Sequence, residues 1–112
     1  MSTLDAVSIV REVYNECSKI FPGGVHDAYL YGSYARGDFD SESDVDILLT
    51  IDTDGVEIAK YRNALAEVTS KLSLRHDITV SVTAKPLLQF QQYSAILPFY
   101  RNVLQEGIRY AD

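Results

Sequence analysis

The chain has 112 residues, of which 46% are apolar, which is enough for one domain spanning residues 1–112 and too few for two. Sixteen acidic residues against ten basic ones give a formal net charge of -6, and the basic residues are scattered along the chain. Because affinity for a polyphosphate backbone is mostly electrostatic, this charge disfavours direct binding to nucleic acid.

Cys17 is the single cysteine, so the chain forms no internal disulfide. With His26 and His76 as the two imidazoles, it offers no thiolate or histidine cluster for zinc. The N-terminal segment has no basic leader followed by an apolar core, and no apolar run approaches the roughly 18 residues of a membrane span. These features indicate a soluble protein of the reducing cytoplasm, without membrane association.

The first half of the chain predicts one helix, two strands and a single helical turn. Ser2 or Thr3 caps the helix, Pro22-Gly23-Gly24 ends it, and its apolar stripe is Leu4, Val7, Val10, Val13, Tyr14, Cys17 and Ile20. The aromatic segment 26–32 closes with glycine and favours a strand, and 33–37 allows about one helical turn. The continuous apolar run 44–51 predicts a central strand that is covered on much of both faces.

The second half alternates helix and strand. Asp54 and Glu57 resemble a capping box at the start of a long helix that ends near Ser73. The segment 77–82 alternates polar and apolar residues, which predicts a third strand. Pro86 suits the first turn of a short helix, and a last helix follows within 96–104. This order predicts an α/β or α+β fold, a small sheet packed against helices.

Asp44 and Asp46 carry the first chemical signal. Residues i and i+2 of a strand point to the same face, about 6 to 7 Å apart, so these two carboxylates project side by side. Two carboxylates this close repel each other unless one of them is protonated or a cation neutralises both. Mg²⁺ fits, because it prefers hard oxygen ligands and is often held by a few carboxylates together with substrate phosphates.

Asp77 offers a third carboxylate. It begins the predicted strand 77–82, and if that strand lies beside 44–51 its side chain reaches the same place. Three acids can hold two Mg²⁺ ions roughly 4 Å apart, which would activate an attacking hydroxyl and stabilise a departing pyrophosphate. Asp77 could also simply cap or start a strand and face solvent.

Gly32 and Ser33 carry the second signal. A glycine at a strand-to-helix junction lets the backbone approach a ligand closely, and the amides that open the next turn point at it. A nucleotide phosphate fits there, with the Ser33 hydroxyl as a further donor. Arg36 either contacts phosphate or pairs with Asp38 or Asp40, and the sequence leaves this open.

These acidic residues also allow two simpler explanations. An aspartate pair after a serine-rich loop is also typical of a turn or a helix cap. The acids from Asp38 to Asp44 imitate a calcium loop, but Ser43 stands where that loop needs glycine and Leu49 where it needs a bidentate glutamate.

Tyr29 and Tyr31 share one face of the first strand, and the sequence does not say whether that face is buried.

Gly32-Ser33, ten intervening residues and then Asp44-Val45-Asp46 resemble the signature of the nucleotidyltransferase superfamily that includes DNA polymerase beta. The fuller string GSYARGDFDSESDVDILL and the ending NVLQEGIRYAD are similar to the minimal nucleotidyltransferases, so the resemblance covers nearly the whole chain. It implies a polymerase-beta-like fold and a Mg²⁺-dependent enzyme that uses ATP. It also implies that Asp44, Asp46 and Asp77 are the catalytic metal ligands, and that Gly32 and Ser33 contact the phosphates.

Many members of the minimal group are antitoxins of small helical toxins of the HEPN class, which cleave RNA, and some transfer AMP from ATP to a tyrosine of that toxin. The resemblance therefore implies an antitoxin that acts by AMPylation of a HEPN-class partner. Two alternatives stay open: an antitoxin that masks its partner by binding alone, and a transferase for small molecules of the aminoglycoside type. In the second case a homodimer could build the pocket that one short chain lacks.

Overall fold

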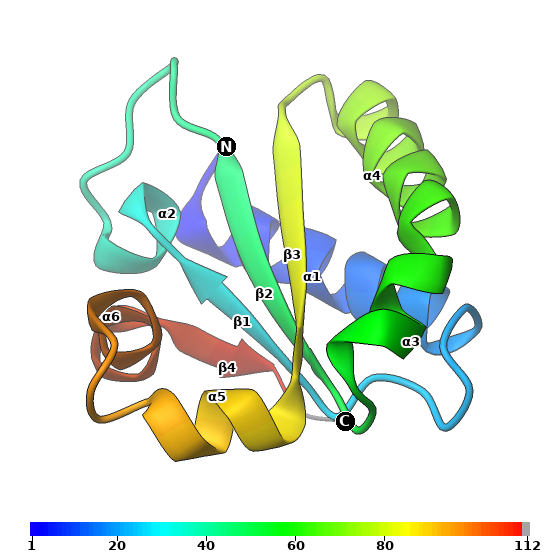
Figure 1. Ribbon diagram of the computed structural model, residues 1–112. Coiled ribbons are helices and arrows are strands. Elements are labelled where there is room, and N and C mark those ends of the chain that lie inside the picture. Colours follow the sequence, from blue (N-terminus) through cyan, green and yellow to red (C-terminus); the bar gives the residue numbers. More distant parts are fainter. Residues whose placement is uncertain (111–112) are drawn as a thin grey trace.

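The central strand β2, Val45–Ile51, organises the sheet. In the computed structural model, which describes residues 1–110, β2 lies between β1 (Asp27–Tyr31) and β3 (Val80–Pro86). β1 runs antiparallel to β2, β3 runs parallel to it, and the short β4 (Ile108–Tyr110) pairs antiparallel with the far side of β1. The strand order is β3-β2-β1-β4, so β3 and β4 are the two edges (Figure 1).

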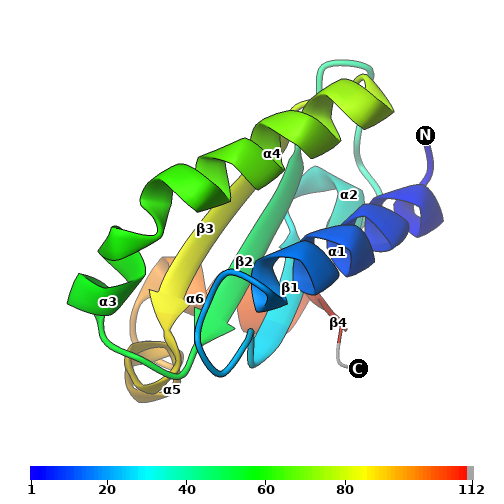
Figure 2. The same cartoon turned by 90° about the vertical axis from the view of Figure 1, so that its right-hand side faces the viewer.

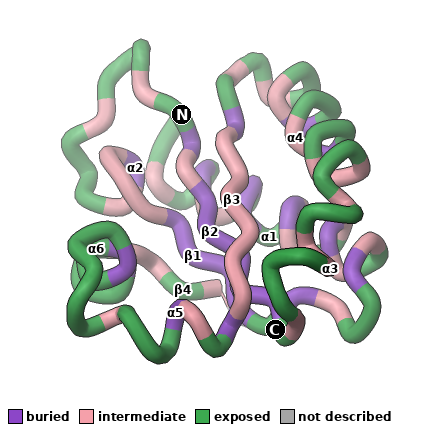
Figure 3. Tube along the Cα trace, in the orientation of Figure 1, coloured by how far each residue is buried: buried purple, intermediate pink, exposed green. Residues whose placement is uncertain are grey.

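Helices cover both faces of this sheet. One face carries α1 (Thr3–Ser18), α3 (Gly55–Lys60) and α4 (Arg62–His76), which lie in front of the strands in Figure 2. The other face carries α5 (Leu87–Tyr93) and α6 (Pro98–Glu106), and the single-turn helix α2 (Ser33–Arg36) follows the end of β1. The buried segments lie between these layers (Figure 3); of the apolar stripe predicted on the first helix, Val10, Val13 and Cys17 are buried, whereas Leu4 is exposed.

Two cores follow from the alternation of side chains along the strands. The larger core joins the sheet to α1 and α4 and includes Ile9, Val13, Ala28, Leu30, Ile47, Leu49 and Leu72. The smaller one joins the opposite face to α5 and α6 and consists of Tyr29, Leu48, Phe90, Tyr100 and Val103, with Tyr31 packed against it. β2 therefore contributes to both cores, as its continuous apolar run predicts.

Local interactions fix the ends of the main elements. Ser2 and Asp5 form a capping box on α1: the Asp5 amide donates to Ser2 Oγ at 3.2 Å, and the Ser2 amide donates to Asp5 Oδ2 at 2.9 Å. The edge strand β4 is tied to β1 by Arg109, whose Nε donates to the buried Asp27 carboxylate at 2.8 Å. These contacts hold the sheet that carries the site.

The elements predicted from the sequence are present, with three corrections. The predicted helix from Asp54 to Ser73 is divided at Tyr61 into α3 and α4, and α4 continues to His76. The predicted strand 77–82 is displaced, because β3 begins at Val80 and ends at Pro86. The strand β4 was not predicted, since three residues after a helix carry too little periodicity. Residues 111–112, the last two of the ending NVLQEGIRYAD, lie outside the described part of the chain.

No helix within residues 1–110 combines the length and the apolar character that crossing a bilayer requires.

Candidate active site

Asp46 interrupts an otherwise buried strand. The other six residues of β2 are buried, whereas Asp46 is half-buried, and Asp44 is exposed immediately before the strand begins. Burial raises the pKa of Asp46 above its usual range and the charge of Asp44 raises it further, while Arg36 opposes the shift. The Asp44 charge therefore acts on the Asp46 carboxylate, as the i, i+2 spacing of the two residues predicts.

Gly32 lies directly against the Asp46 carboxylate. Tyr31 at the end of β1 pairs with Asp46 in the sheet, so the next residue turns over that side chain. Gly32 has φ 77° and ψ -156°, a backbone conformation that residues other than glycine rarely adopt. A Cβ at this position would lie 2.5 Å from Asp46 Oδ2, so any other residue here would displace that carboxylate. The backbone turn and the carboxylate therefore line one shared space.

Ser33 and Arg36 open and close α2, beside that space. Ser33 is the first residue of the helix and Gly32 is its N-cap. Arg36 is exposed, and its guanidinium pairs with Asp38 at 3.2 Å and with Glu106 of α6 at 3.6 Å. The ion pair with Asp38 is one of the two alternatives that the sequence leaves open for Arg36.

The structure places Asp77 differently from the sequence prediction. Asp77 is the exposed C-cap residue of α4, with the left-handed φ of 51°, and lies three residues before β3 begins. Within residues 1–110, no group of three or more His, Cys, Asp and Glu side chains is arranged to hold a metal ion. The prediction that Asp77 begins a strand is wrong, because the α4 backbone continues past Ser73. The predicted cluster of three carboxylates is not assembled.

Ser81 occupies the position on β3 that lies opposite Asp46. Paired residues of neighbouring strands point to the same face, so Tyr31, Asp46 and Ser81 form a row across three strands. The sequence reasoning missed Ser81, because it took Asp77 for the polar residue that would meet Asp46. A strand starting at Val80 would have been indicated by the β-branched residues Val80, Val82 and Thr83.

Tyr31 closes the site on the side of β1. Burial raises the pKa of its phenol, and the neighbouring Asp46 charge raises it further. Its ring contacts Phe99 of α6 edge to face, with 5.3 Å between ring centroids. The sequence left the direction of Tyr29 and Tyr31 open, and α5 and α6 cover the face they share.

Two other candidate residues have structural partners. His76 Nε2 lies 2.5 Å from Glu12 Oε2 of α1, in a contact that joins α4 to α1. Cys17 is buried in the larger core, and this burial raises the pKa of its thiol to about 12. The place of Cys17 agrees with its position on the predicted apolar stripe of the first helix, whereas His76 ends α4 and contacts α1.

The donor atoms at Asp44 and Asp46 suit Mg²⁺. The carboxylates of Asp44 and Asp46, two residues apart and next to the Gly32 turn, match the way this ion is commonly bound, by one or two carboxylates together with substrate phosphates. Ser81, a neutral hydroxyl, stands where a third acid would complete an all-protein set. The chain therefore fits a metal that arrives with a nucleotide.

Comparison with known proteins identifies the class. A family model described as "Nucleotidyltransferase domain" matches residues 10–110. The chain belongs to this family, and it is a nucleotidyltransferase.

Two relatives from Methanocaldococcus jannaschii are similar over most of their length. "Putative protein adenylyltransferase MJ0604" is 31% identical over 98 residues, which is 88% of this chain and 90% of the relative. "Putative protein adenylyltransferase MJ0141" is 33% identical over 78 residues, which is 70% of this chain and 77% of the relative.

Solved structures agree on the fold. A crystal structure described as a "putative nucleotidyltransferase from Sulfolobus solfataricus" is similar with a TM-score of 0.57 and 18% identity, covering 96% of this chain and 81% of the other. A structure described as "the toxin-antitoxin with AMP-PNP" is similar with a TM-score of 0.50 and 18% identity, covering 97% of this chain and 72% of the other. The predicted polymerase-beta-like fold is confirmed.

Proposed function

We propose that this nucleotidyltransferase is a Mg²⁺-dependent protein adenylyltransferase, which transfers AMP from ATP to a hydroxyl group of a partner protein. The observation that carries the proposal is the close approach of Gly32 to Asp46, because it joins the Gly-Ser turn to a carboxylate pair. The names of the two Methanocaldococcus jannaschii relatives support a protein as the acceptor.

The proposed roles follow from these positions. Gly32 and Ser33 restrain the β- and γ-phosphates of ATP, and Arg36 turns from Asp38 to a phosphate oxygen when the nucleotide binds. Asp44 and Asp46 hold Mg²⁺, which when bound neutralises the developing charge of the pyrophosphate. Since the chain supplies two close carboxylates, most of the catalysis is positioning and charge compensation.

The transfer balances without a further reactant. The acceptor hydroxyl oxygen attacks the α-phosphorus in line, and the bond from this phosphorus to the bridging oxygen of the β-phosphate breaks. The products are an AMP ester and pyrophosphate, and the hydroxyl proton is released to water. We leave Asp77 out of this scheme, because an exposed helix C-cap three residues before β3 is not the position that a third metal ligand needs.

The partner we propose is a toxin of the HEPN class, and the acceptor group is a tyrosine hydroxyl. The resemblance of the motif to minimal nucleotidyltransferases supports this partner, as does the fold shared with a toxin–antitoxin structure that contains AMP-PNP. Binding of AMP-PNP is a property of that structure, and it supports ATP as the nucleotide for this chain.

The test is transfer of labelled AMP from ATP to the protein encoded beside this chain, with wild type compared with Asp44→Asn and Asp46→Asn. Asp52→Asn is the matched control, because Asp52 is an exposed aspartate just beyond the other end of β2. We expect labelling by wild type and by Asp52→Asn and none by the other two variants. If those two variants fail to label the partner but still neutralise it, the protein acts by masking.

A further inference from the structure

The strand β3 leaves one edge of the sheet open beside the site. It is the terminal strand in the order β3-β2-β1-β4, and within residues 1–110 its sheet partner is β2 alone. Figure 1 shows β3 with a strand on one side only. Before its final Lys85 and Pro86, the residues that commonly protect such an edge, β3 consists of Val80-Ser81-Val82-Thr83-Ala84. This edge can accept a further strand.

The backbone groups of Val82 and Ala84 point to the open side. The Val45 amide donates to the Thr79 carbonyl at 2.9 Å, so Thr79 faces β2. In a parallel strand, the amide and the carbonyl of one residue point to the same side, and the next residue points to the opposite side. Val80, Val82 and Ala84 therefore face away from β2. The Val80 amide indeed donates to Ser73 Oγ of α4 at 3.0 Å. Among residues 1–110, Val82 and Ala84 thus each offer an unpaired amide and carbonyl to an incoming strand.

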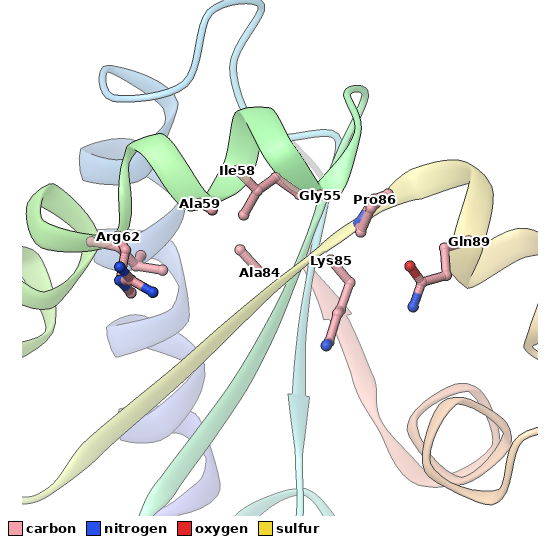
Figure 4. Close-up of a pocket in the computed structure, with 9 residues that line it drawn as sticks. Gly55, Ile58, Ala59, Arg62, Ala84, Lys85, Pro86 and Gln89 are labelled. Carbon is pink, nitrogen blue, oxygen red and sulfur yellow. The ribbon is translucent and has the colours of Figure 1, made fainter.

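A hollow follows this edge along the length of β3. It consists of two adjoining cavities of about 430 and 310 Å³, both lined by Arg62 and Leu65 at the start of α4. The first also contacts Ser81 and Val82, and the second contacts Ala84 and Lys85. Figure 4 shows the second cavity, with Arg62 on one side and Lys85 on the other. The edge is therefore accessible between β3 and the helices that flank it.

The edge is continuous with the proposed catalytic site. Neighbouring strands lie about 4.8 Å apart, so a strand added beside β3 would lie about 10 Å from β2. Ser81, which is small, is the residue between that strand and Asp46. A long side chain such as tyrosine, projecting from the added strand on the Asp46 face, spans this gap and brings its hydroxyl to the carboxylates.

We propose that the polypeptide acceptor binds as an added β-strand along the open edge of β3, with its modified hydroxyl directed over Ser81 toward Asp46. This inference rests on the proposed function and specifies how its acceptor is recognised. Main-chain hydrogen bonds to Val82 and Ala84 supply affinity, and alternate side chains supply specificity.

The charge of the hollow indicates what the acceptor strand carries. Arg62 and Lys85 line it, and neither forms an ion pair with a carboxylate of the described residues. Both cations therefore face the hollow with their charge available to a ligand, in a chain whose net charge is -6. The acceptor segment therefore carries aspartate or glutamate near its tyrosine.

The test uses the full chain and an array of tyrosine hexapeptides with acidic or basic flanking residues. Each peptide is also made with N-methyl groups on alternate backbone amides, which removes strand pairing and keeps every side chain. Transfer of labelled AMP from ATP is measured. We expect acidic peptides to be labelled, their methylated forms to show a KM raised about tenfold, and basic peptides to be poor acceptors.

A matched protein variant is Ala84→Pro. Proline removes an amide that faces away from β2, so the pairing of β3 with β2 is retained while strand addition is blocked. We expect the KM for the peptide to rise about tenfold, with the KM for ATP and kcat unchanged. Should Ala84→Pro fail to fold, the methylated peptides test the same contact on the wild-type protein.

Several outcomes would overturn the inference. Equal kinetics with methylated and unmethylated peptides would do so, as would labelling of a partner protein with no peptide accepted. A wild-type dimer that Ala84→Pro dissociates would show that a second copy occupies the edge. Absence of transfer to partner protein and peptides alike, with AMP-PNP binding intact, would instead remove the proposed function itself.

Discussion

Gly32 and Asp46 come from different strands and occupy one small space: a Cβ on Gly32 would lie 2.5 Å from Asp46 Oδ2. The glycine is therefore required twice, once for its φ of 77° and once for its lack of a side chain. This relationship explains why a Gly-Ser pair and a later aspartate pair form one site although ten residues separate them.

Gly32→Ala should reduce transfer about 100-fold. The new methyl group displaces the Asp46 carboxylate, and a misplacement of about 1 Å can reduce a rate by about 100-fold. Gly37→Ala is the matched control, because Gly37 also has a positive φ, 88°, but a Cβ there meets no atom within 4 Å. Both variants should lose about 1 kcal/mol of stability from backbone strain. Equal activity of the two variants would contradict the steric argument.

Asp46→Asn should raise stability at neutral pH in the absence of Mg²⁺. Because the pKa of Asp46 is raised on folding, stability is fully present below the unfolded pKa of about 3.9 and is lost as pH rises through the folded pKa. The asparagine variant avoids this loss, so its melting temperature should exceed that of wild type at pH 7. The difference should vanish near pH 3.

Mg²⁺ should reverse that order. Adding the ion with AMP-PNP stabilises the wild-type pair of carboxylates and raises its melting temperature. The Asp46→Asn variant lacks one ligand and should gain much less. A wild-type melting temperature that does not respond to Mg²⁺ with AMP-PNP would argue against a metal at Asp44 and Asp46.

Asp77→Gly should keep the transfer activity. Asp77 caps α4 with a left-handed φ of 51°, and glycine adopts this conformation at lower cost, so the variant should gain up to about 1 kcal/mol of stability. Thermal unfolding and labelled AMP transfer would be measured together. A loss of transfer of about 100-fold, comparable to that at Asp46, would return Asp77 to the catalytic site.

Arg36→Ala should weaken ATP binding more than it slows the chemical step. A guanidinium that leaves Asp38 for a phosphate oxygen contributes a charged hydrogen bond, and its loss should raise the KM for ATP about tenfold. Arg101→Ala on the exposed side of α6 is the control. An unchanged KM for ATP would assign Arg36 to its ion pairs with Asp38 and Glu106 alone.

The sequence predicts the chemistry of this site better than its geometry. Asp44 and Asp46 follow from a two-residue period within an apolar run, which is local information. The place of Asp77 does not, because it depends on where α4 ends, and an aspartate that tolerates left-handed φ can cap a helix as readily as it starts a strand.

Tertiary contacts decide the remaining differences. The division of one predicted helix at Tyr61 has no proline or glycine to announce it; the Tyr61 ring packs edge to face on Phe21. The direction of Tyr31 depends on α5 and α6, which lie far along the chain. β4 exists because Arg109 reaches the buried Asp27, and three residues carry no pattern of their own.

The most direct test of the account is titration calorimetry of the wild-type protein with AMP-PNP in the presence of Mg²⁺, repeated without the ion and with Asp44→Asn and Asp46→Asn. We expect binding heat for wild type with Mg²⁺, and little or none when the ion or either carboxylate is removed. No heat for wild type, or equal heat for wild type and both variants, would contradict the claim that Asp44 and Asp46 bind a nucleotide-bound metal beside Gly32.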